Sequence, residues 1–202
     1  MQFCRIGQLH GTIVNISSFF FGKDLVMPQY RELTSNELAV ELFDHFERKQ
    51  VVTDCKRKVD GEWTVLADPF IDDWSDSDYS YLVECLKNTL AGGGVVWGAF
   101  VDDELKGFAS VERNTFGSEG QYMELTSLHV SNDMRRHGMG AVLFLLAADF
   151  ARNLGVKKLY ISSHSAVETQ AFYEHMGCVE AEEYNEETVQ REPTDCQLEY
   201  VL

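Results

Sequence analysis

The sequence predicts a mixed α/β domain, and two strand–helix pairs carry this prediction. Residues 121–130 form an apolar, strand-like segment that ends in a polar turn, and apolar residues then recur at spacings of three and four over 139–154. Residues 158–162 are a shorter apolar run, and a second helical segment follows over 165–177. Strands that alternate with helices in this way indicate a sheet with helices packed on its faces.

The second helix carries signals at both of its ends. Ser165 and Glu168 stand three residues apart, which is the spacing of a capping box. Gly177 stands where many helices end in a left-handed residue, a conformation that glycine adopts without steric cost. We therefore expect a helix with defined ends over 165–177.

The remaining segments are assigned by the same patterns. Helical spacing predicts helices over about 35–46 and 76–90, while 51–77 and 183–196 are expected to be irregular acidic segments. Asp102-Asp103 separates two of the predicted strands and is typical of a hairpin turn. The other predicted strands are 30–33, 95–101, 105–112, 178–182 and 197–201.

Length and composition favour a single domain without a membrane segment. A chain of 202 residues suits one domain with a substantial core, and no apolar run approaches the roughly 20 residues that a membrane helix needs. Residues 1–26 fit poorly with the pattern that follows, so we interpret them as an N-terminal extension before a domain over 27–202. A natural start at Met27 stays an open alternative.

Charge and cysteine usage limit the partners. The net charge of −16 disfavours nucleic acid as a ligand, because phosphates would be repelled over most of the surface. The cysteines are widely scattered and never form a C-x-x-C pair, which predicts reduced thiols in the cytoplasm and no zinc or other metal site. They are residues 4, 55, 85, 178 and 196.

The turn after residue 130 has the features of an anion-binding site. Arg135 and Arg136 precede two closely spaced glycines, Gly138 and Gly140, at the start of the predicted helix. A helix N-terminus offers unpaired N–H groups and positive potential, and glycines let an anion approach the backbone. A dinucleotide fingerprint would need a third glycine at position 143, which is Leu, and the Gly-Lys-Ser/Thr of a P-loop is absent.

The arrangement that remains, Arg135-x-x-Gly138-x-Gly140 between a strand and a long helix, resembles the acetyl-CoA-binding motif of the GNAT N-acetyltransferase superfamily. A second motif in the right order, Phe172-Tyr173-Glu174-x-x-Gly177, resembles the signature of the family's next helix. The resemblance implies the GNAT acyl-CoA N-acyltransferase fold, with a mixed central sheet of about seven strands flanked by four helices.

The resemblance also implies where acetyl-CoA binds as a co-substrate. Backbone N–H groups from residue 136 to residue 141 would surround its pyrophosphate, and 128–130 would pair with its pantetheine arm. Many family members carry an asparagine seven residues before the tyrosine, where this chain has Ala166, and Ser165 or Ser163 could replace it. The implied binding residues are Leu128, His129, Val130, Arg135, Arg136, His137, Gly138, Met139, Gly140, Ala141 and Ser165.

Two residues are candidates for proton transfer. The resemblance places the hydroxyl of Tyr173 near the CoA sulfur, as the acid that protonates the leaving thiolate. Glu124 is the candidate base, because a carboxylate within an apolar strand is costly unless it is paired or functional. Strand alternation puts it on one face with Tyr122, Thr126 and Leu128, unless a bulge changes the facing. A structural ion pair at Glu124, a packing role for Tyr173 and His129 as the base stay open.

The acceptor is predicted from the two acidic segments. In the family fold the acceptor groove lies between loops that correspond here to about 51–75 and 183–196. We expect their negative potential to attract a small cationic amine, such as a polyamine, an aminoglycoside or a streptothricin-like antibiotic, with Trp63, Phe70 and Trp74 as walls. The alternatives are a protein lysine or N-terminal acetyltransferase and a CoA-binding sensor without turnover. Family members are frequently dimers, so a homodimer stays an open alternative. The acidic residues are Asp60, Glu62, Asp68, Asp72, Asp73, Glu183, Glu186, Glu187, Glu192 and Asp195.

Overall fold

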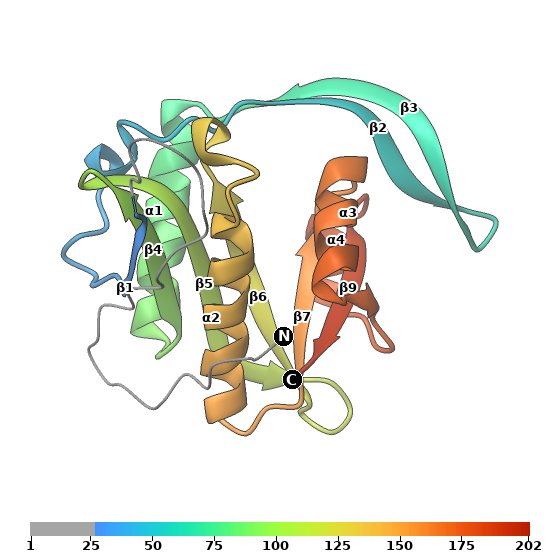
Figure 1. The fold of residues 1–202 in the computed structure, drawn as a ribbon. Helices are drawn as coiled ribbons and strands as arrows, with labels where there is room; N and C mark the ends of the chain where they lie inside the picture. Colours follow the sequence, from blue (N-terminus) through green and yellow to red (C-terminus); the bar gives the residue numbers. More distant parts are fainter. Residues whose placement is uncertain (1–26) are drawn as a thin grey trace, which may run out of the picture.

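Seven strands of the protein form one mixed sheet in the computed structural model, which describes residues 27–202 (Figure 1). The pairing of β6 with β7 is parallel, and the other neighbours are antiparallel. The N-terminal extension expected over 1–26 lies outside the described residues. The strand order across the sheet is β1 (Gln29–Glu32), β4 (Val95–Val101), β5 (Glu104–Phe116), β6 (Tyr122–Val130), β7 (Lys158–Ser163), β9 (Cys196–Val201) and β8 (Val179–Glu180).

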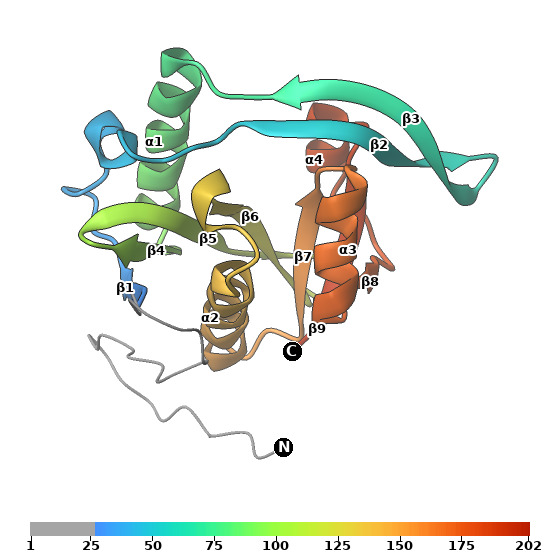
Figure 2. The same cartoon turned by 45° about the horizontal axis from the view of Figure 1, so that its top comes forward.

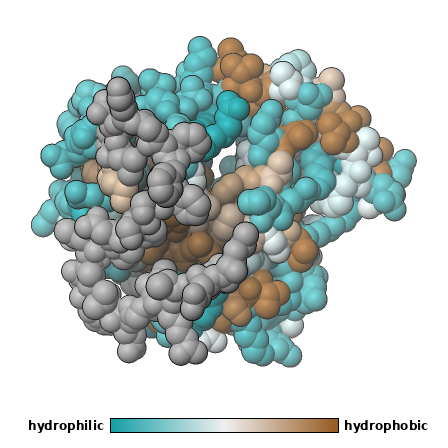
Figure 3. Space-filling model, viewed as in Figure 1, coloured by the Kyte–Doolittle hydropathy of each residue, from teal (hydrophilic) through white to brown (hydrophobic). Residues whose placement is uncertain are grey.

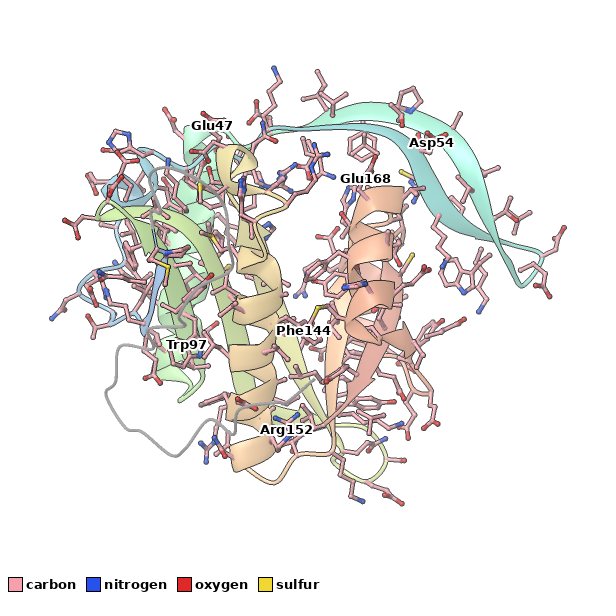
Figure 4. All side chains as sticks on the ribbon, in the orientation of Figure 1. Glu47, Asp54, Trp97, Phe144, Arg152 and Glu168 are labelled. Atoms are coloured by element: carbon pink, nitrogen blue, oxygen red, sulfur yellow. The ribbon has the colours of Figure 1, made fainter. Side chains whose placement is uncertain are left out.

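Four α-helices cover the two faces of this sheet. Helices α2 (Met139–Asn153) and α3 (Val167–Met176) lie on one face, and α1 (Asp76–Ala91) and α4 (Glu186–Arg191) lie on the other (Figures 1 and 2). The main core lies between the sheet and α2, where Phe144 points toward α3 (Figure 4). None of these helices, within residues 27–202, is long and apolar enough to cross a membrane. The predicted fold class of seven strands and four helices is confirmed.

Two of the helices differ from the sequence-based expectation. Only a single 3-10 turn, Val40–Phe43, forms where a helix over 35–46 was expected, because Ala39 is extended and interrupts the run. The fourth helix is α4, which lies within the segment expected to be an acidic loop. The side chain of Asn185 caps α4 by accepting hydrogen bonds from the N–H groups of Glu187 and Thr188. An asparagine before two glutamates is a helix-start signal that the sequence contains.

The acidic segment over 51–77 is not irregular, which corrects the second expectation. It forms a long hairpin of β2 (Gln50–Val59) and β3 (Glu62–Asp72), which arches over the strand ends toward α3 (Figures 1 and 2). Asp60 and Gly61 make its turn with φ angles of 52° and 87°, and Asp-Gly is a strong hairpin signal. Most of β3 is exposed on both faces, so the period-two pattern that marks a half-buried strand is absent.

The hairpin exposes apolar residues along its length. Brown, hydrophobic residues are visible at the upper right of Figure 3, where the hairpin lies. Its buried contacts form a small separate cluster, in which Val52 and Cys55 pack against Ala166 at the start of α3. The exposed large residues are Val51, Val59, Val65, Leu66, Phe70 and Ile71.

Strand β6 contains a bulge that changes which side chains share a face. Ser127 pairs with Ser110 and Leu125 pairs with Val111, so Thr126 is an extra residue in β6. As a result Leu128 packs with the core under α2, whereas Tyr122 belongs to a cluster on the opposite face. The expectation that Leu128 shares a face with Tyr122 and Glu124 is therefore wrong.

Strands β6 and β7 separate partway along their length. Their parallel pairing covers only three residue pairs and ends where Glu124 faces Tyr160. Beyond that point residues 125–130 pair with β5 alone among the described residues. The sheet therefore opens next to Glu124, and none of the strands within 27–202 pairs with this backbone edge of β6.

Candidate active site

The turn between β6 and α2 presents a series of backbone donors. A 3-10 turn, Asn132–Met134, comes first, and the chain then reverses through Arg136 and Gly138, whose φ angles are 64° and 81°. No described residue accepts a hydrogen bond from the backbone N–H groups of residues 136–141. Six consecutive free N–H groups at a helix N-terminus fit the phosphates of an anionic co-substrate.

The two arginines of the turn lie differently. Arg135 donates from Nε to the carbonyl of Val130 at 3.3 Å and from a terminal nitrogen to the carbonyl of Arg48 at 3.4 Å. It therefore ties the turn to the end of β6 and to the segment before β2. Arg136 and His137 are exposed, so the side chain of Arg136 is the one available to an anion at this turn.

The two glycines of the turn have different physical roles. Gly138 needs its left-handed backbone, since a Cβ there would meet nothing within 4 Å. At Gly140 a Cβ would lie 3.4 Å from the ring of Phe172 and 3.6 Å from Val130, which are ordinary van der Waals contacts, so this position could hold a small side chain.

Strand β6 beyond the bulge places its side chains away from its free edge. Leu128 and Val130 pack on the core under α2. The ring of His129 packs against Trp74 and Phe108, with centroids 4.9 Å and 5.1 Å away. Burial, with the nearby charges of Arg48 and Arg135, lowers the pKa of His129 to about 3. A group with this pKa is a weak base at neutral pH, which favours Glu124 over His129 as the proton acceptor.

Glu124 is partly buried on the α1/α4 face, beside the point where β6 and β7 separate. Its two oxygens accept hydrogen bonds from Thr188 Oγ1 at 3.2 Å and from Asn185 Nδ2 at 3.3 Å. Burial raises the pKa of Glu124, and the hydrogen bond from Thr188 and the charge of Arg191 act in the opposite direction. The site therefore holds an oriented carboxylate whose affinity for a proton exceeds that of an exposed glutamate.

Tyr173 lies on the α2/α3 face, in the main core. Its ring packs against Phe144 and Phe172, with centroids 6.2 Å and 5.1 Å away. No described residue makes a hydrogen bond with its hydroxyl. Burial raises the pKa of Tyr173 far above its usual range, so the hydroxyl keeps its proton and can donate it.

Ser165 is held by the hairpin, and it does not cap α3. Its hydroxyl accepts a hydrogen bond from Arg57, and its carbonyl accepts one from the N–H of Lys56 at 2.7 Å. The N-cap of α3 is Ala166, without a side-chain cap, so the predicted capping box is wrong. The hairpin takes the serine hydroxyl that the helix would have used. Gly177 has a φ of 91° and confirms the predicted left-handed C-cap.

Two of the acidic residues expected around the acceptor groove form ion pairs, and a third accepts hydrogen bonds from neutral groups. Asp68 and Asp72 in the hairpin form ion pairs with Arg57 and Arg48. Glu183 accepts hydrogen bonds from Ser118 and Gln121 on the loop before β6. The two paired aspartates therefore add little negative potential near Glu124, whereas the hydrogen bonds to Glu183 lower its pKa and keep its charge in place.

The three aromatic residues expected to line the acceptor groove lie in two different places. Trp63 donates to Glu180 at 2.8 Å, beside β8, which is away from Glu124. Phe70 packs on His164 and Trp74 packs on His129. Only Phe70 and Trp74 thus lie at the separated ends of β6 and β7.

Sequence reasoning missed Asn185 and Thr188, the two residues that hold Glu124. The N-cap pattern at Asn185 could have predicted the helix, but not that its first turn packs over a strand more than 60 positions earlier. Within residues 27–202 no group of three or more His, Cys, Asp or Glu side chains is arranged to hold a metal ion.

Several known proteins resemble this chain. Solved structures with the same fold include nourseothricin acetyltransferase, at 17% identity and a TM-score of 0.64 over 86% of this chain and 98% of the other. A putative streptothricin acetyltransferase from Bacillus anthracis str. Ames, in complex with acetyl coenzyme A, has 15% identity and a TM-score of 0.64 over 89% and 98% of the two chains.

A third structure, the PaiA N-acetyltransferase from Thermoplasma acidophilum in complex with coenzyme A, has 15% identity and a TM-score of 0.55 over 87% of this chain and 99% of the other. No curated protein matches the sequence. The family model described as the acetyltransferase (GNAT) family matches residues 60–178, more than half of the chain and the part that contains both motifs. The chain therefore belongs to the GNAT family and is an acetyl-CoA-dependent N-acetyltransferase.

Proposed function

We propose that the protein transfers the acetyl group of acetyl-CoA to a primary amine of a small cationic acceptor, with Glu124 as the base and Tyr173 as the acid. One observation carries the proposal. A hydrogen-bonded carboxylate with a raised pKa and a protonated hydroxyl that no described residue bonds to lie on opposite faces of the sheet, beside the separation of β6 and β7. A base and an acid on the two sides of one opening suit an acyl transfer between two bound substrates.

The chain's residues would divide the reaction as follows. The N–H groups of residues 136–141 bind the pyrophosphate, and the free edge of 128–130 orients the pantetheine arm. When bound, acetyl-CoA supplies the acetyl group as an activated thioester. Glu124 removes a proton from the acceptor ammonium, so that the amine nitrogen can form its bond to the acetyl carbon. Tyr173 gives its proton to the sulfur as the carbon–sulfur bond breaks, and the second proton that the nitrogen loses as it becomes an amide restores the tyrosine hydroxyl.

The need for a base follows from the acceptor's own pKa. An alkyl ammonium with a pKa near 10.4 is neutral in only roughly one molecule in a thousand at pH 7. A carboxylate beside it favours binding of the cation and then accepts its proton. The charge of Glu112 on β5 also raises the pKa of Glu124, so a second carboxylate adds to the negative potential there. The net charge of −16 adds a general attraction for cations.

The printed names of two similar structures suggest the acceptors to try first. They are acetyltransferases of nourseothricin and streptothricin, and their similarity to this chain is one of fold. We propose streptothricin-like antibiotics, aminoglycosides and polyamines as candidate acceptors. Basic peptides test the protein acetyltransferase alternative.

The deciding experiment is release of free thiol from acetyl-CoA over this panel, with Glu124→Gln and Tyr173→Phe alongside. We expect turnover on a cationic amine and a loss of about 10²- to 10⁴-fold in kcat/KM at pH 7 in Glu124→Gln. Acetyl-CoA affinity, measured by calorimetry, should be unchanged in that variant. Tight binding without turnover on any amine would overturn the proposal in favour of a CoA-binding module. Wild-type activity in Glu124→Gln would overturn the assignment of the base.

A further inference from the structure

We propose that Asn185, which caps α4, and Thr188, in its first turn, are positioning residues that orient the carboxylate of Glu124 and keep it ionised. The inference rests on the proposed role of Glu124 as the base. It assigns a task to α4, a six-residue helix that the sequence analysis placed within an acidic loop.

The geometry engages both oxygens of the carboxylate. Thr188 Oγ1 donates to Oε1 at 3.2 Å and Asn185 Nδ2 donates to Oε2 at 3.3 Å. One donor to each oxygen fixes the rotation of the carboxylate about its terminal bond. An ionised carboxylate has about four acceptor sites, so acceptor positions remain on both oxygens for the ammonium group of a substrate.

The two donors are themselves held in place. The Oδ1 atom of Asn185 caps α4, which leaves its Nδ2 group free to donate to Glu124. The backbone N–H of Asn185 donates to the hydroxyl of Tyr160 at 3.0 Å. Tyr160 lies directly opposite Glu124 in the β6–β7 register, and its hydroxyl also donates to Gln197. The residue that faces the base on the next strand therefore anchors one of the two residues that orient it.

The segment before α4 is anchored by a second tyrosine of the same face. The N–H of Glu183 donates to the hydroxyl of Tyr122 at 3.3 Å, and that hydroxyl donates to the buried Glu199 at 2.5 Å. Thr188 is itself buried, so its hydroxyl has little access to water as an alternative partner. Such a hydroxyl points to a function in satisfying the partly buried carboxylate.

Titratable groups on three neighbouring elements face Glu124. Arg191 on α4 lowers its pKa and Glu112 on β5 raises it. Burial raises the pKa of Tyr160 on β7 to about 12, so this residue stays uncharged while Glu124 titrates. Hydrogen bonds donated to the ionised form also lower the pKa, and burial raises it. Removal of one donor while Arg191 and Glu112 stay in place must therefore raise the pKa of Glu124.

The test is the pH profile of kcat/KM in Thr188→Val, which replaces the hydroxyl with a methyl group of similar size. We expect the acidic limb, where Glu124 must be ionised, to move up by about one pH unit. Thr188→Ser keeps a hydroxyl and should restore the wild-type limb. Thr115→Val makes the same chemical change at an exposed position of β5, outside both segments of the acceptor groove, and should leave the limb unmoved. Asn185→Ser keeps a capping oxygen but loses the amide donor, so it should shift the limb in the same direction as Thr188→Val.

A second readout does not depend on turnover. The ¹³C carboxyl shift of Glu124, assigned through Glu124→Gln, titrates directly, and its midpoint should rise in Thr188→Val by as much as the kinetic limb. An unchanged midpoint in a variant with the wild-type melting temperature would refute the positioning role. If Glu124→Gln is fully active while the midpoint does rise in Thr188→Val, the base assignment fails and the contact between α4 and Glu124 stands.

Discussion

The same physical effect, burial, suits both proposed catalytic residues for opposite reasons. A buried carboxylate binds a proton more tightly and becomes a better base near neutral pH. A buried phenol loses its proton less readily, so Tyr173 remains an acid over the whole working range. Glu124 must be ionised to act as a base, and its two hydrogen bonds partly offset the effect of burial on its pKa. Tyr173 acts in its neutral form, and no described residue makes a hydrogen bond with its hydroxyl.

The raised pKa of Tyr173 gives a prediction about the basic side of the pH profile. An acid contributes below its pKa and is lost as the pH rises through it, and here burial places that pKa above 10. We therefore expect no downward limb in kcat/KM between pH 7 and 9.5. Tyr173→Phe should lower kcat by about 10²-fold at each pH in this range, with acetyl-CoA affinity unchanged.

A matched control for that variant is Tyr200→Phe, since Tyr200 packs on the same ring of Phe144 at 5.0 Å. The activity of this control should equal that of the wild type. Comparable losses in both variants, with lowered melting temperatures, would mean that Tyr173 is an aromatic of the core and not the acid.

At single residues, the sequence could predict which side chains carry the chemistry. It could not predict in every case which face of a strand a side chain lies on or which residue it bonds to. A glutamate within an apolar strand is visible as an anomaly, so Glu124 could be selected from the sequence. The facing of Leu128 could not, because the inserted Thr126 is detectable only in the pairing with β5. The hydrogen-bond partner of Ser165 could not be predicted from the sequence either, because Arg57 lies 108 positions earlier in the chain.

At the scale of elements, the strand–turn–helix unit of β6 and α2 could be predicted from local sequence signals. The helix α4 and the β2–β3 hairpin also carry local signals, but the sequence analysis did not assign them. Glycine positions and helical spacing predict the start of α2 within the turn. The hairpin has a local signal too, Asp60-Gly61, but its strands lack a buried face that would make them periodic. An element that is exposed on both sides is therefore better predicted from its turn than from its strands.

The turn before α2 gives a prediction with a built-in control. Gly138 and Gly155 have φ angles of 81° and 79°, and at neither position would a Cβ meet another atom within 4 Å. Gly138→Ala and Gly155→Ala should therefore each lower the free energy of unfolding by about 1 kcal/mol through the same backbone strain. Only Gly138→Ala changes the N–H groups at the pyrophosphate site, so only this variant should weaken acetyl-CoA binding, by about tenfold.

Thermal unfolding and calorimetric titration of the two variants separate these effects. If both variants lose the same acetyl-CoA affinity, or if neither variant loses any, the turn that begins α2 has no specific role in binding.

For the whole molecule, the dominant feature is the excess of negative charge. Repulsion between like charges destabilises a compact chain, and salt screens it. Surface ion pairs such as Lys157–Glu119 act the other way and weaken with salt, but exposed pairs contribute only about 0–1 kcal/mol each. With a net charge of −16, we expect the repulsion to be the larger effect.

The melting temperature should accordingly rise when sodium chloride is increased from about 10 mM to about 150 mM, over which the Debye length falls from roughly 30 Å to roughly 8 Å. Chloride is the suitable anion, since sulfate or phosphate could bind at residues 136–141 and stabilise the protein by mass action. A melting temperature that falls with sodium chloride would show that the ion pairs outweigh the repulsion.

The contacts of the β2–β3 hairpin have a consequence for the order in which the chain acquires its structure. Lys56 bonds to Glu174, Lys58 to Glu180 and Arg57 to the carbonyl of Thr194, across separations of 118, 122 and 137 positions. A two-stranded hairpin is marginally stable alone, and contacts between distant positions form only after the intervening chain has folded. During synthesis the hairpin is therefore made well before the residues that hold it. Its apolar side chains stay exposed until the last strands have left the ribosome and folded.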